Sequence, residues 1–525
     1  MTGTRVYHPF LLGLYPPLAL YAHGINNLFF ETTLSGFAIS IGFSAAVFGV
    51  LWLIFRDPGK AGIVATALIV FAFFYGHLNN FLAATFFADQ LTVAGQLPRI
   101  VQSWSLRIWG IGFGVFVIWL CWRKADYGNL TKILNVVSAA VLIVPAITIA
   151  MHLGTAPGQG GTAKSGPPAA TGDTALKAKG KPRDVYYLIF DRYGSRRALQ
   201  DLYGFDNGAF LKSLSDRGFY VAEESNGNYF GSHQSLASSL NMTYLDRLTR
   251  EMGRNSGDFN PLSRMVQDNE VQGLLRGAGY KYFHLGSTWE VTRLNKNADV
   301  NFSGKAPNEF LSVLMQTNAI PIIARKWDIQ IKWIESKCFR VNAKLEMLKQ
   351  IATRPETTYT FAHILLPHEP FVFDADGRCL SEKEAVKRTW KTNFLAQLRF
   401  TNDMILEIVD ELIQGSDVEP IIIIQADEGP YPARLVEAYL FKRPFNLAEE
   451  GTDEEWSQKM GILNALYLPG VEAKGLRPRI SPVNSFRIIF NEYFGASYDI
   501  LPDRGFTYRD LEHAYDFIDV TEKIR

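Results

Sequence analysis

Two strongly apolar runs, far apart in the chain, each end in carboxylates. VYYLIF leads into Asp191, and PIIIIQA leads into Asp427 and Glu428. Short β-branched and aromatic runs of this kind are typical of buried parallel strands, whose carboxyl ends form the ligand-binding edge of an open sheet. Either position alone fits an ordinary turn or helix-cap residue. Together, the acids predict a metal site at one sheet edge.

A segment rich in hydroxyl residues follows the first of these acids by about forty residues. It reads NYFGSHQSLASSLNMTYL, from Asn228 to Leu245, with Gly231 directly before Ser232. A serine at a helix amino terminus meets a positive dipole and free backbone donors, which suits a nucleophile that attacks an anionic ester. The alternative is a serine that only caps the helix, and composition alone favours that alternative.

The elements that must position these residues alternate along the second part of the chain. Predicted strands are Val185 to Phe190, Tyr280 to Leu285, Tyr359 to Leu365, Ile421 to Gln425 and Ala465 to Leu468. Helical spacing occurs at Arg196 to Leu214, Val271 to Gly277, Asn393 to Gln414 and Val483 to Tyr493. Such alternation predicts an α/β domain with a mainly parallel sheet covered on both faces.

The first part of the chain is much more apolar than its average suggests. The mean hydropathy of the whole chain is zero, but roughly the first 150 residues carry few charges. Five stretches are predicted to span a bilayer. They are Phe10 to Phe30, Phe37 to Phe55, Ala61 to about Phe81, Ile108 to Trp122 and Ile133 to His152. The fourth stretch is short and lies between two arginines.

The loop charges predict the orientation of these spans, because cytoplasmic loops retain Lys and Arg. Alternate loops, all on one side, carry Arg5, Arg56, Lys60, Arg123, Lys124 and Lys132. The amino terminus is therefore expected in the cytoplasm, with everything after His152 outside the inner membrane. No cleavable signal peptide is expected, because the first apolar run is too long and contains polar residues.

A tract rich in Gly, Ala, Pro and Lys separates the two parts. The expected organisation is a transmembrane domain at 1–153, a flexible linker at 154–181 and an extracytoplasmic domain at 182–525. Cys338 and Cys379 both lie in the outer domain, where they either pair or remain as buried thiols. The net charge of +1 gives no sign of an acidic partner, and no nucleic-acid motif is found.

Together these motifs resemble the alkaline phosphatase and sulfatase superfamily. They are most similar to its membrane-tethered branch of lipoteichoic acid synthases and phosphoethanolamine transferases, which have five spans, a linker and an outer α/β sandwich domain. YYLIFDRYG resembles the strand with the first metal acid, and SHQSLASSL resembles the segment that opens with the nucleophile. Asp427-Glu428-Gly429 corresponds to a late Asp-His-Gly motif, and His368-Glu369-Pro370-Phe371 to a His-x-Pro-Phe element. Ser481 to Gly495 resembles the closing helix of the family.

The resemblance implies one divalent cation held by Asp191, Ser232, Asp427 and Glu428. Glu428 stands where the family usually has His, which favours Mn²⁺ or Mg²⁺ ahead of Ca²⁺ or Zn²⁺. No second set of Asp and His ligands is found. Residues 232 to 236 lack the Pro and Arg of the sulfatase frame, so a formylglycine-dependent sulfatase is the weaker alternative.

The expected function is a phosphotransferase that moves phosphoglycerol or phosphoethanolamine from a membrane phospholipid, through phospho-Ser232, to an envelope glycan or lipid. His368 would bind phosphoryl oxygens or protonate a leaving group, and His363 competes for that role. His233 is a weaker candidate for contacting the acceptor. The alternatives are a membrane-anchored hydrolase of sulfate or phosphate esters and a non-catalytic descendant. Donor headgroup, acceptor and oligomeric state stay open.

Two similar polar motifs occur in the membrane part. HGINN, from His23, and HLNN, from His77, lie near the expected outer ends of the first and third spans. One hypothesis is that they hold a lipid headgroup, and the alternative is hydrogen bonding between helices.

Overall fold

The computed structural model describes residues 5–86, 99–123, 127–155, 176–304, 307–316, 318–319, 336–441 and 445–525. The chain forms two compact units, Met1–Gly161 with Pro307–Ile334, and Thr162–Ala306 with Glu335–Arg525. Each unit is described by itself below. The segment from Pro307 lies in the sequence within the expected outer domain but packs with the first unit.

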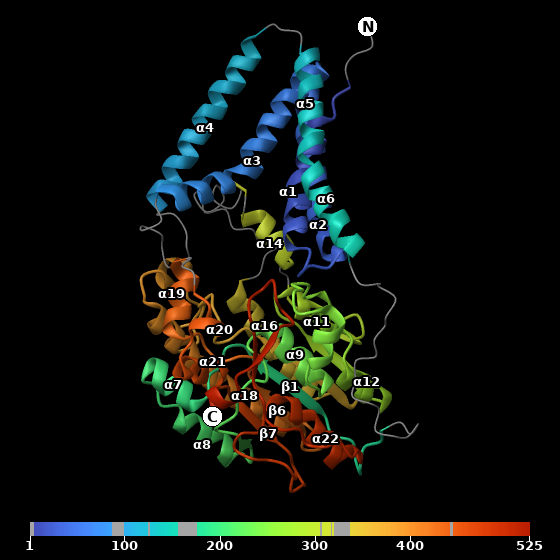
Figure 1. The fold of residues 1–525 in the computed structure, drawn as a ribbon, viewed down its shortest axis with the longest axis vertical. Helices are drawn as coiled ribbons and strands as arrows, with labels where there is room; N and C mark the ends of the chain where they lie inside the picture. The colour runs from blue at the N-terminus through green and yellow to red at the C-terminus, as the bar shows by residue number, and fades with distance from the viewer. Residues whose placement is uncertain are drawn as a thin grey trace. The chain divides into compact units, whose positions relative to one another are not determined.

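The first unit consists of helices (Figure 1). Their bounds are α1 His8–Gly24, α2 Phe30–Phe55, α3 Pro58–Phe86, α4 Arg99–Trp122, α5 Gly128–Val141, α6 Ile143–Thr155 and α14 Glu309–Gln316. Three stretches of the described chain are long and apolar enough to cross a membrane: Phe30–Phe55, Pro58–Gly76 and Gly128–Gly154. The expected first span, α1, has 17 residues and contains Pro16 and Pro17. In α4 the apolar stretch is Trp104–Leu120. Of the five expected spans, three therefore meet both requirements.

Helix α14 packs on α1 and α2 through an apolar face. Phe310, Leu311 and Leu314 are buried in a cluster with Tyr21 and Ile25 of α1. The Asn308 side chain donates a hydrogen bond to the Thr32 carbonyl (2.5 Å), and the Ala319 amide donates to the Ala72 carbonyl (2.9 Å). This short helix is therefore part of the first unit, although the chain before Pro307 and after Ile334 belongs to the second.

The second unit is built on a seven-stranded sheet with the order β2-β7-β6-β1-β5-β3-β4. Its strands are β1 Val185–Phe190, β2 Tyr220–Val221, β3 Lys281–Leu285, β4 Val300–Phe302, β5 Thr358–Ile364, β6 Ile421–Gln425 and β7 Asn464–Tyr467. The strands from β4 to β6 run parallel, whereas β7 and β2 are antiparallel to their neighbours. A separate hairpin joins β8 Phe506–Tyr508 and β9 Phe517–Asp519. The expectation of a mainly parallel sheet is thus confirmed.

Helices cover both faces of this sheet (Figure 1). Their bounds are α7 Arg196–Tyr203, α8 Gly208–Asp216, α9 Ser232–Asn241, α10 Asp246–Met252, α11 Asn260–Gln267, α12 Glu270–Gly277, α13 Glu290–Arg293, α16 Lys337–Ala352, α17 Glu382–Ala385, α18 Trp390–Gly415, α19 Ala433–Phe441, α20 Leu447–Glu450, α21 Asp453–Met460 and α22 Ser485–Phe494, with 3-10 turns η2 Pro482–Asn484 and η3 Thr521–Ile524. Alternate residues of β1 enter two cores, because strand side chains alternate between faces. Tyr186, Leu188 and Phe190 pack into one core, and Val185, Tyr187 and Ile189 into the other.

The single helix expected over Arg196 to Leu214 is wrong. Gly204 adopts a left-handed conformation (φ +63°) that ends α7, and α8 begins only at Gly208. Glycine tolerates this conformation without the steric cost of a Cβ, so it is a common helix terminator.

Of the two states left open for the outer cysteines, the structure shows the disulfide. Cys338, near the start of α16, is bonded to Cys379 across a sequence separation of 41 residues. Disulfides are typical of proteins in oxidising compartments.

Candidate active site

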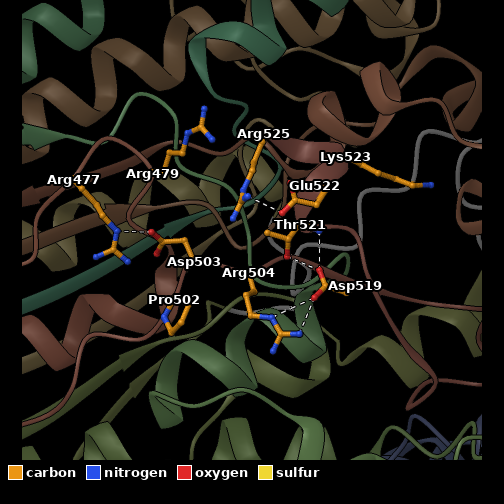
Figure 2. A pocket seen from close by; sticks show the side chains of 10 residues that line it. All are labelled: Arg477, Arg479, Pro502, Asp503, Arg504, Asp519, Thr521, Glu522, Lys523 and Arg525. Carbon is orange, nitrogen blue, oxygen red and sulfur yellow. Dashed lines mark hydrogen bonds and ion pairs between the residues drawn. The ribbon is translucent and has the colours of Figure 1, made fainter.

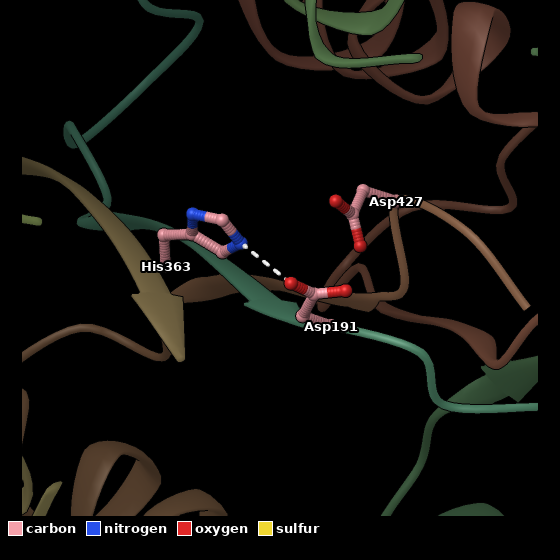
Figure 3. Close-up of side chains that lie close together, drawn as sticks. All are labelled: Asp191, His363 and Asp427. Carbon is pink, nitrogen blue, oxygen red and sulfur yellow. Dashed lines mark ion pairs between the residues drawn. The ribbon is translucent and has the colours of Figure 1, made fainter. Parts of the chain in front are cut away.

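Three adjacent strands place two carboxylates and one histidine side by side at one edge of the sheet. Asp191 directly follows β1, Asp427 lies two residues after β6, and His363 is the penultimate residue of β5. One ligand atom from each of the three lies within 4.8 Å of the other two, and all three residues are buried (Figure 3). Parallel strands bring their carboxyl ends together, which explains how residues 236 positions apart in sequence meet.

Each of these residues points a buried polar atom without a hydrogen-bond partner at this position. The atoms are Asp191 Oδ1, His363 Nε2 and Asp427 Oδ2. Buried acceptors without partners are rare in folded proteins, because leaving them unpaired costs free energy. Two carboxylates and an imidazole nitrogen therefore form a donor set that fits a divalent cation.

Titration behaviour reflects this crowding of acids. Burial, followed by repulsion from Asp427 and Glu428, raises the pKa of Asp191 well above its ordinary value. Burial, followed by repulsion from Glu428, raises the pKa of Asp427 to about 6. Burial also lowers the pKa of His363 well below its ordinary value. A bound cation would offset the repulsion and leave the imidazole neutral, as a metal ligand requires.

His363 is held by its second ring nitrogen. Nδ1 shares a hydrogen bond with the Thr292 hydroxyl (2.7 Å), and Nε2 lies 3.8 Å from Asp191 Oδ2. Metal-binding histidines commonly use the remote nitrogen in this way, which fixes the tautomer and the ring orientation. The sequence offered His363 as a catalytic candidate, and the structure places it in the ligand position.

Ser232 is the first residue of α9 and follows the N-cap residue Gly231. Its side chain lies beside Asp427, where interaction with the serine hydroxyl works to lower the pKa of that carboxyl against the larger effect of burial. The structure thus brings the expected nucleophile to two of the expected metal acids, at a helix amino terminus. Because Ser232 is only partly buried, its oxygen can be reached from outside.

Glu428, the fourth expected ligand, is not in this cluster. Its Oε1 lies 2.9 Å from Arg192 Nε, and its Oε2 lies 2.9 Å from Lys459 Nζ. Burial works to raise the pKa of Glu428, but the charges of Lys459 and Arg192 hold it below its ordinary value. Both carboxylate oxygens are thus occupied by cationic side chains.

Arg192 and Lys459 adjoin the candidate site and were not predicted from the sequence. Arg192 makes two hydrogen bonds to the Glu369 carboxylate (2.8 and 2.6 Å), and its guanidinium lies 3.7 Å from the Tyr431 ring centroid. Lys459 Nζ lies 4.8 Å from that ring. The position of Arg192 next to Asp191 was an available signal, whereas nothing in the local sequence marks Lys459.

His368 lies at the margin of the cluster. Its Nε2 is 4.0 Å from Asp191 Oδ2, and its Nδ1 is 2.5 Å from the Glu369 carbonyl. Lys337 Nζ donates to the His368 carbonyl (2.6 Å), which holds the turn to α16. The side chain is 24% exposed, so His368 contacts both the Asp191 carboxylate and solvent.

His233 and the membrane motifs stand apart from the cluster. The His233 ring packs between Phe259 and Trp289, at centroid distances of 4.9 and 4.6 Å, and burial lowers its pKa to about 3. His23 is exposed in the last turn of α1. The side chain of His77 lies outside the described residues, so the headgroup hypothesis stays a prediction.

No protein-family model and no curated protein matches the sequence. Similar solved structures include the C-terminal periplasmic domain of EcEptC from Escherichia coli (12% identity, covering 66% of this chain and 94% of that chain, TM-score 0.41). Others are a 2-O GAG sulfatase (12%, 61% and 72%, TM-score 0.38) and an alkaline phosphatase superfamily protein from Vibrio parahaemolyticus (11%, 65% and 78%, TM-score 0.38).

At these TM-scores the structural comparison assigns no family, and the alkaline phosphatase and sulfatase superfamily stays the prediction made from the motifs. With identities of 12% or less and TM-scores of 0.42 or less, the likeness assigns no residue role. The roles below rest on the geometry of this chain.

Proposed function

We propose that this chain is a membrane-anchored, metal-dependent phosphotransferase that moves a lipid-derived phosphoglycerol or phosphoethanolamine group to an envelope glycan or lipid. One arrangement carries the proposal: Ser232, at a helix amino terminus, lies beside Asp427, which forms a buried cluster of unpartnered ligand atoms with Asp191 and His363. A nucleophile, its proton acceptor and a cation site are thus combined at one sheet edge.

Asp191, His363, Asp427 and the Ser232 hydroxyl would hold the cation. When bound, it would lower the hydroxyl pKa of Ser232 and neutralise charge on the phosphoryl oxygens. The expected preference for Mn²⁺ or Mg²⁺ depended on Glu428 as a ligand. With His363 in the set and Glu428 paired to Arg192 and Lys459, the mixed nitrogen and oxygen donors favour Zn²⁺ or Mn²⁺.

In the first step, Ser232 Oγ forms a bond to the phosphorus of the lipid phosphodiester, and the bond from phosphorus to the diacylglycerol oxygen breaks. Asp427, which lies beside the serine, accepts its proton. His368 bonds to the Glu369 carbonyl through Nδ1, so its Nε2 must take up a proton before it can bind phosphoryl oxygens or protonate the leaving oxygen. In the second step, an acceptor hydroxyl attacks phosphorus and gives its proton to His368 Nε2, while the bond from phosphorus to Ser232 Oγ breaks and Asp427 returns its proton to that oxygen.

The location follows from the same proposal. The apolar helices near the amino terminus supply a membrane anchor, and the loop charges favour an inner-membrane protein with a cytoplasmic amino terminus. The Cys338–Cys379 disulfide supports an extracytoplasmic, oxidising environment for the catalytic unit.

The test is incubation of the full chain, in detergent with Zn²⁺ or Mn²⁺, with phospholipids labelled in the headgroup phosphate. Mass spectrometry should find the labelled group on Ser232, and an acceptor should remove it. Ser232→Ala should abolish labelling. Ser235→Ala is the matched control, because its hydroxyl lies on the same helix but bonds to the Tyr229 carbonyl (2.9 Å).

Other results would replace this assignment. Release of the headgroup phosphate to water at the same rate with and without acceptors would identify a hydrolase. Formylglycine at position 232 would identify a sulfatase. Absence of both modifications, together with no metal bound, would contradict an enzymatic role.

A further inference from the structure

A hollow of the second unit is lined by none of the residues of the candidate active site. It has a volume of about 920 Å³ and lies among the chain segments around residues 477–479, 502–504 and 519–525 (Figure 2). Its lining carries five cationic side chains: Arg477, Arg479, Arg504, Lys523 and Arg525. Three acidic side chains accompany them: Asp503, Asp519 and Glu522. The hollow therefore has an excess of positive charge.

Two of the acids are committed to internal hydrogen bonds. Asp503 accepts from Arg477 Nε and from both the amide and the hydroxyl of Ser481 (2.5, 3.0 and 3.0 Å). Asp519 accepts two bonds from Arg504, through Nε and Nη2 (3.3 and 2.7 Å). Carboxylates saturated in this way fix the arginines in position, and less side-chain entropy is lost when a ligand binds.

The other cationic groups are open to solvent. The side chains of Arg479 and Arg525 are 49% and 54% exposed, in ion pairs whose acidic partners are exposed as well. Lys523 is also exposed. Exposed ion pairs contribute little free energy, so a ligand anion can displace them. Guanidinium groups bind phosphate and carboxylate in a two-pronged geometry, which suits these positions to an anionic ligand.

The hollow is joined to the nucleophile by two chain segments that run in the same direction. Tyr229 and Phe506 form a parallel bridge, and the Asn228 side chain donates to the Arg504 carbonyl (2.9 Å). The first segment reaches Ser232. The second reaches Tyr508, whose hydroxyl is 3.4 Å from the point where a Cβ on Gly231 would lie. A rise of four residues, as from Arg504 to Tyr508, is at most about 13 Å long when the chain is extended.

We propose that this hollow binds phosphate or carboxylate groups of an anionic glycan, and that this glycan is the acceptor of the transferred group. The identity of the ligand as the acceptor rests on the proposed function and on the two paired chain segments that lead from the hollow toward Ser232. The presence of an anionic glycan site rests only on the lining charges and the volume.

Binding can be measured without lipid donor or added metal, so its outcome does not depend on phospho-Ser232. The probe is a fluorescent oligosaccharide carrying phosphate groups, titrated into the full chain in detergent at two salt concentrations. The triple variant Arg479→Gln, Lys523→Gln, Arg525→Gln should weaken binding by about tenfold or more, and the remaining affinity should depend less on salt.

The matched control removes three exposed cations from other ion pairs of the same unit: Arg197→Gln, Lys212→Gln and Arg354→Gln. It should bind the probe like the unaltered chain, and thermal unfolding checks that both variants are folded. The unphosphorylated oligosaccharide should bind at least tenfold more weakly than the probe.

Three results would overturn the proposal. These are unchanged affinity in the triple variant, an equal loss in the control variant, and equal binding of the neutral oligosaccharide. Inorganic phosphate and vesicles of phosphatidylglycerol are added as competitors. If either displaces the probe at an equal phosphate concentration, the site recognises phosphate alone or a lipid surface, and the glycan assignment is wrong.

Discussion

At the scale of single residues, Thr292 controls which nitrogen of His363 is available to a metal. Its hydroxyl is shared with His363 Nδ1 and also with Ser287 Oγ (2.9 Å), and it is fully buried. Thr292→Val keeps the shape but removes the hydroxyl. We expect it to lower divalent-metal affinity by about 10- to 100-fold, measured by calorimetry on the full chain.

Thr292→Ser is the matched control for this prediction, since it restores the hydroxyl. The serine variant should bind metal with nearly the affinity of the unaltered chain. Equal metal affinity in the valine variant, with an unchanged unfolding temperature, would show that the ring needs no such support.

His284 gives a pH prediction at the same scale. Burial lowers its pKa to about 4, and its two nitrogens are bonded to the Tyr282 hydroxyl and the Thr292 carbonyl (2.9 and 2.7 Å). Between pH 6.5 and about 4, the unfolded chain binds a proton here and the folded chain does not. Folding free energy from this group is therefore present above pH 6.5 and is lost as the pH falls toward 4.

His284→Gln should remove this contribution, which is up to about 3 kcal/mol. The unfolding temperature of the variant, measured from pH 7 to pH 4, should fall less steeply than that of the unaltered chain. Parallel curves for the two proteins would show that His284 is protonated in the folded state.

At the scale of elements, α2 and α14 meet at a glycine. A Cβ on Gly36 would lie 2.5 Å from Phe310 Cε1, so a larger side chain cannot fit while α14 stays in place. Gly36→Leu should displace α14 and expose Leu311, which is 7% exposed. A Leu311→Cys probe, in a Cys121→Ser background, should react with maleimide faster in the Gly36→Leu protein.

The control for this prediction lies on the same helix. A Cβ on Gly42 would meet nothing within 4 Å, so Gly42→Leu should leave the reactivity of the probe unchanged. Equal maleimide labelling of the Leu311→Cys protein alone, with Gly36→Leu and with Gly42→Leu would mean that packing against α2 does not fix the position of α14.

The elements that carry the acids were predictable because their signal is local. β1 and β6 are uninterrupted apolar runs, and each ends where the sequence places an acid. The antiparallel pairing of β7 and β2 was not predictable, since a buried apolar strand has the same composition in either direction. The break between α7 and α8 could not be predicted either. It depends on the left-handed conformation of Gly204, and a glycine in the sequence is compatible with several conformations.

The same difference between local sequence signals and tertiary packing explains which residues of the candidate site could be predicted. Asp191, Ser232 and Asp427 could be predicted from short motifs, and the structure brings them together. The ion pairs of Glu428 could not be predicted, because Lys459 comes from a helix end 31 residues later and Arg192 must adopt a left-handed conformation (φ +62°) to reach it. Pairings of this kind depend on tertiary packing and leave no spacing pattern.

At the scale of the whole molecule, the disulfide is a covalent constraint on the catalytic unit. It joins α16 to the segment that follows the His368 turn. Closing a loop of 41 residues reduces the freedom of the unfolded chain and stabilises by about 2–4 kcal/mol. Cys338→Ala with Cys379→Ala should lower the unfolding temperature, and reductant should lower that of the unaltered chain alone. A lack of response to reductant in both proteins would contradict this role.

The chain crosses between its two units three times, near residues 161, 306 and 334. A catalyst attached through one linker explores every orientation that the linker allows, including those that turn its active site away from its substrate. Two further covalent crossings remove many of those orientations. If the donor is the membrane lipid proposed above, such a restriction would raise the effective concentration of that lipid at Ser232 without any new contact. The return of the chain to the first unit at α14 would therefore raise how often Ser232 meets the proposed lipid donor. This is a kinetic effect, separate from the affinity of the site for lipid.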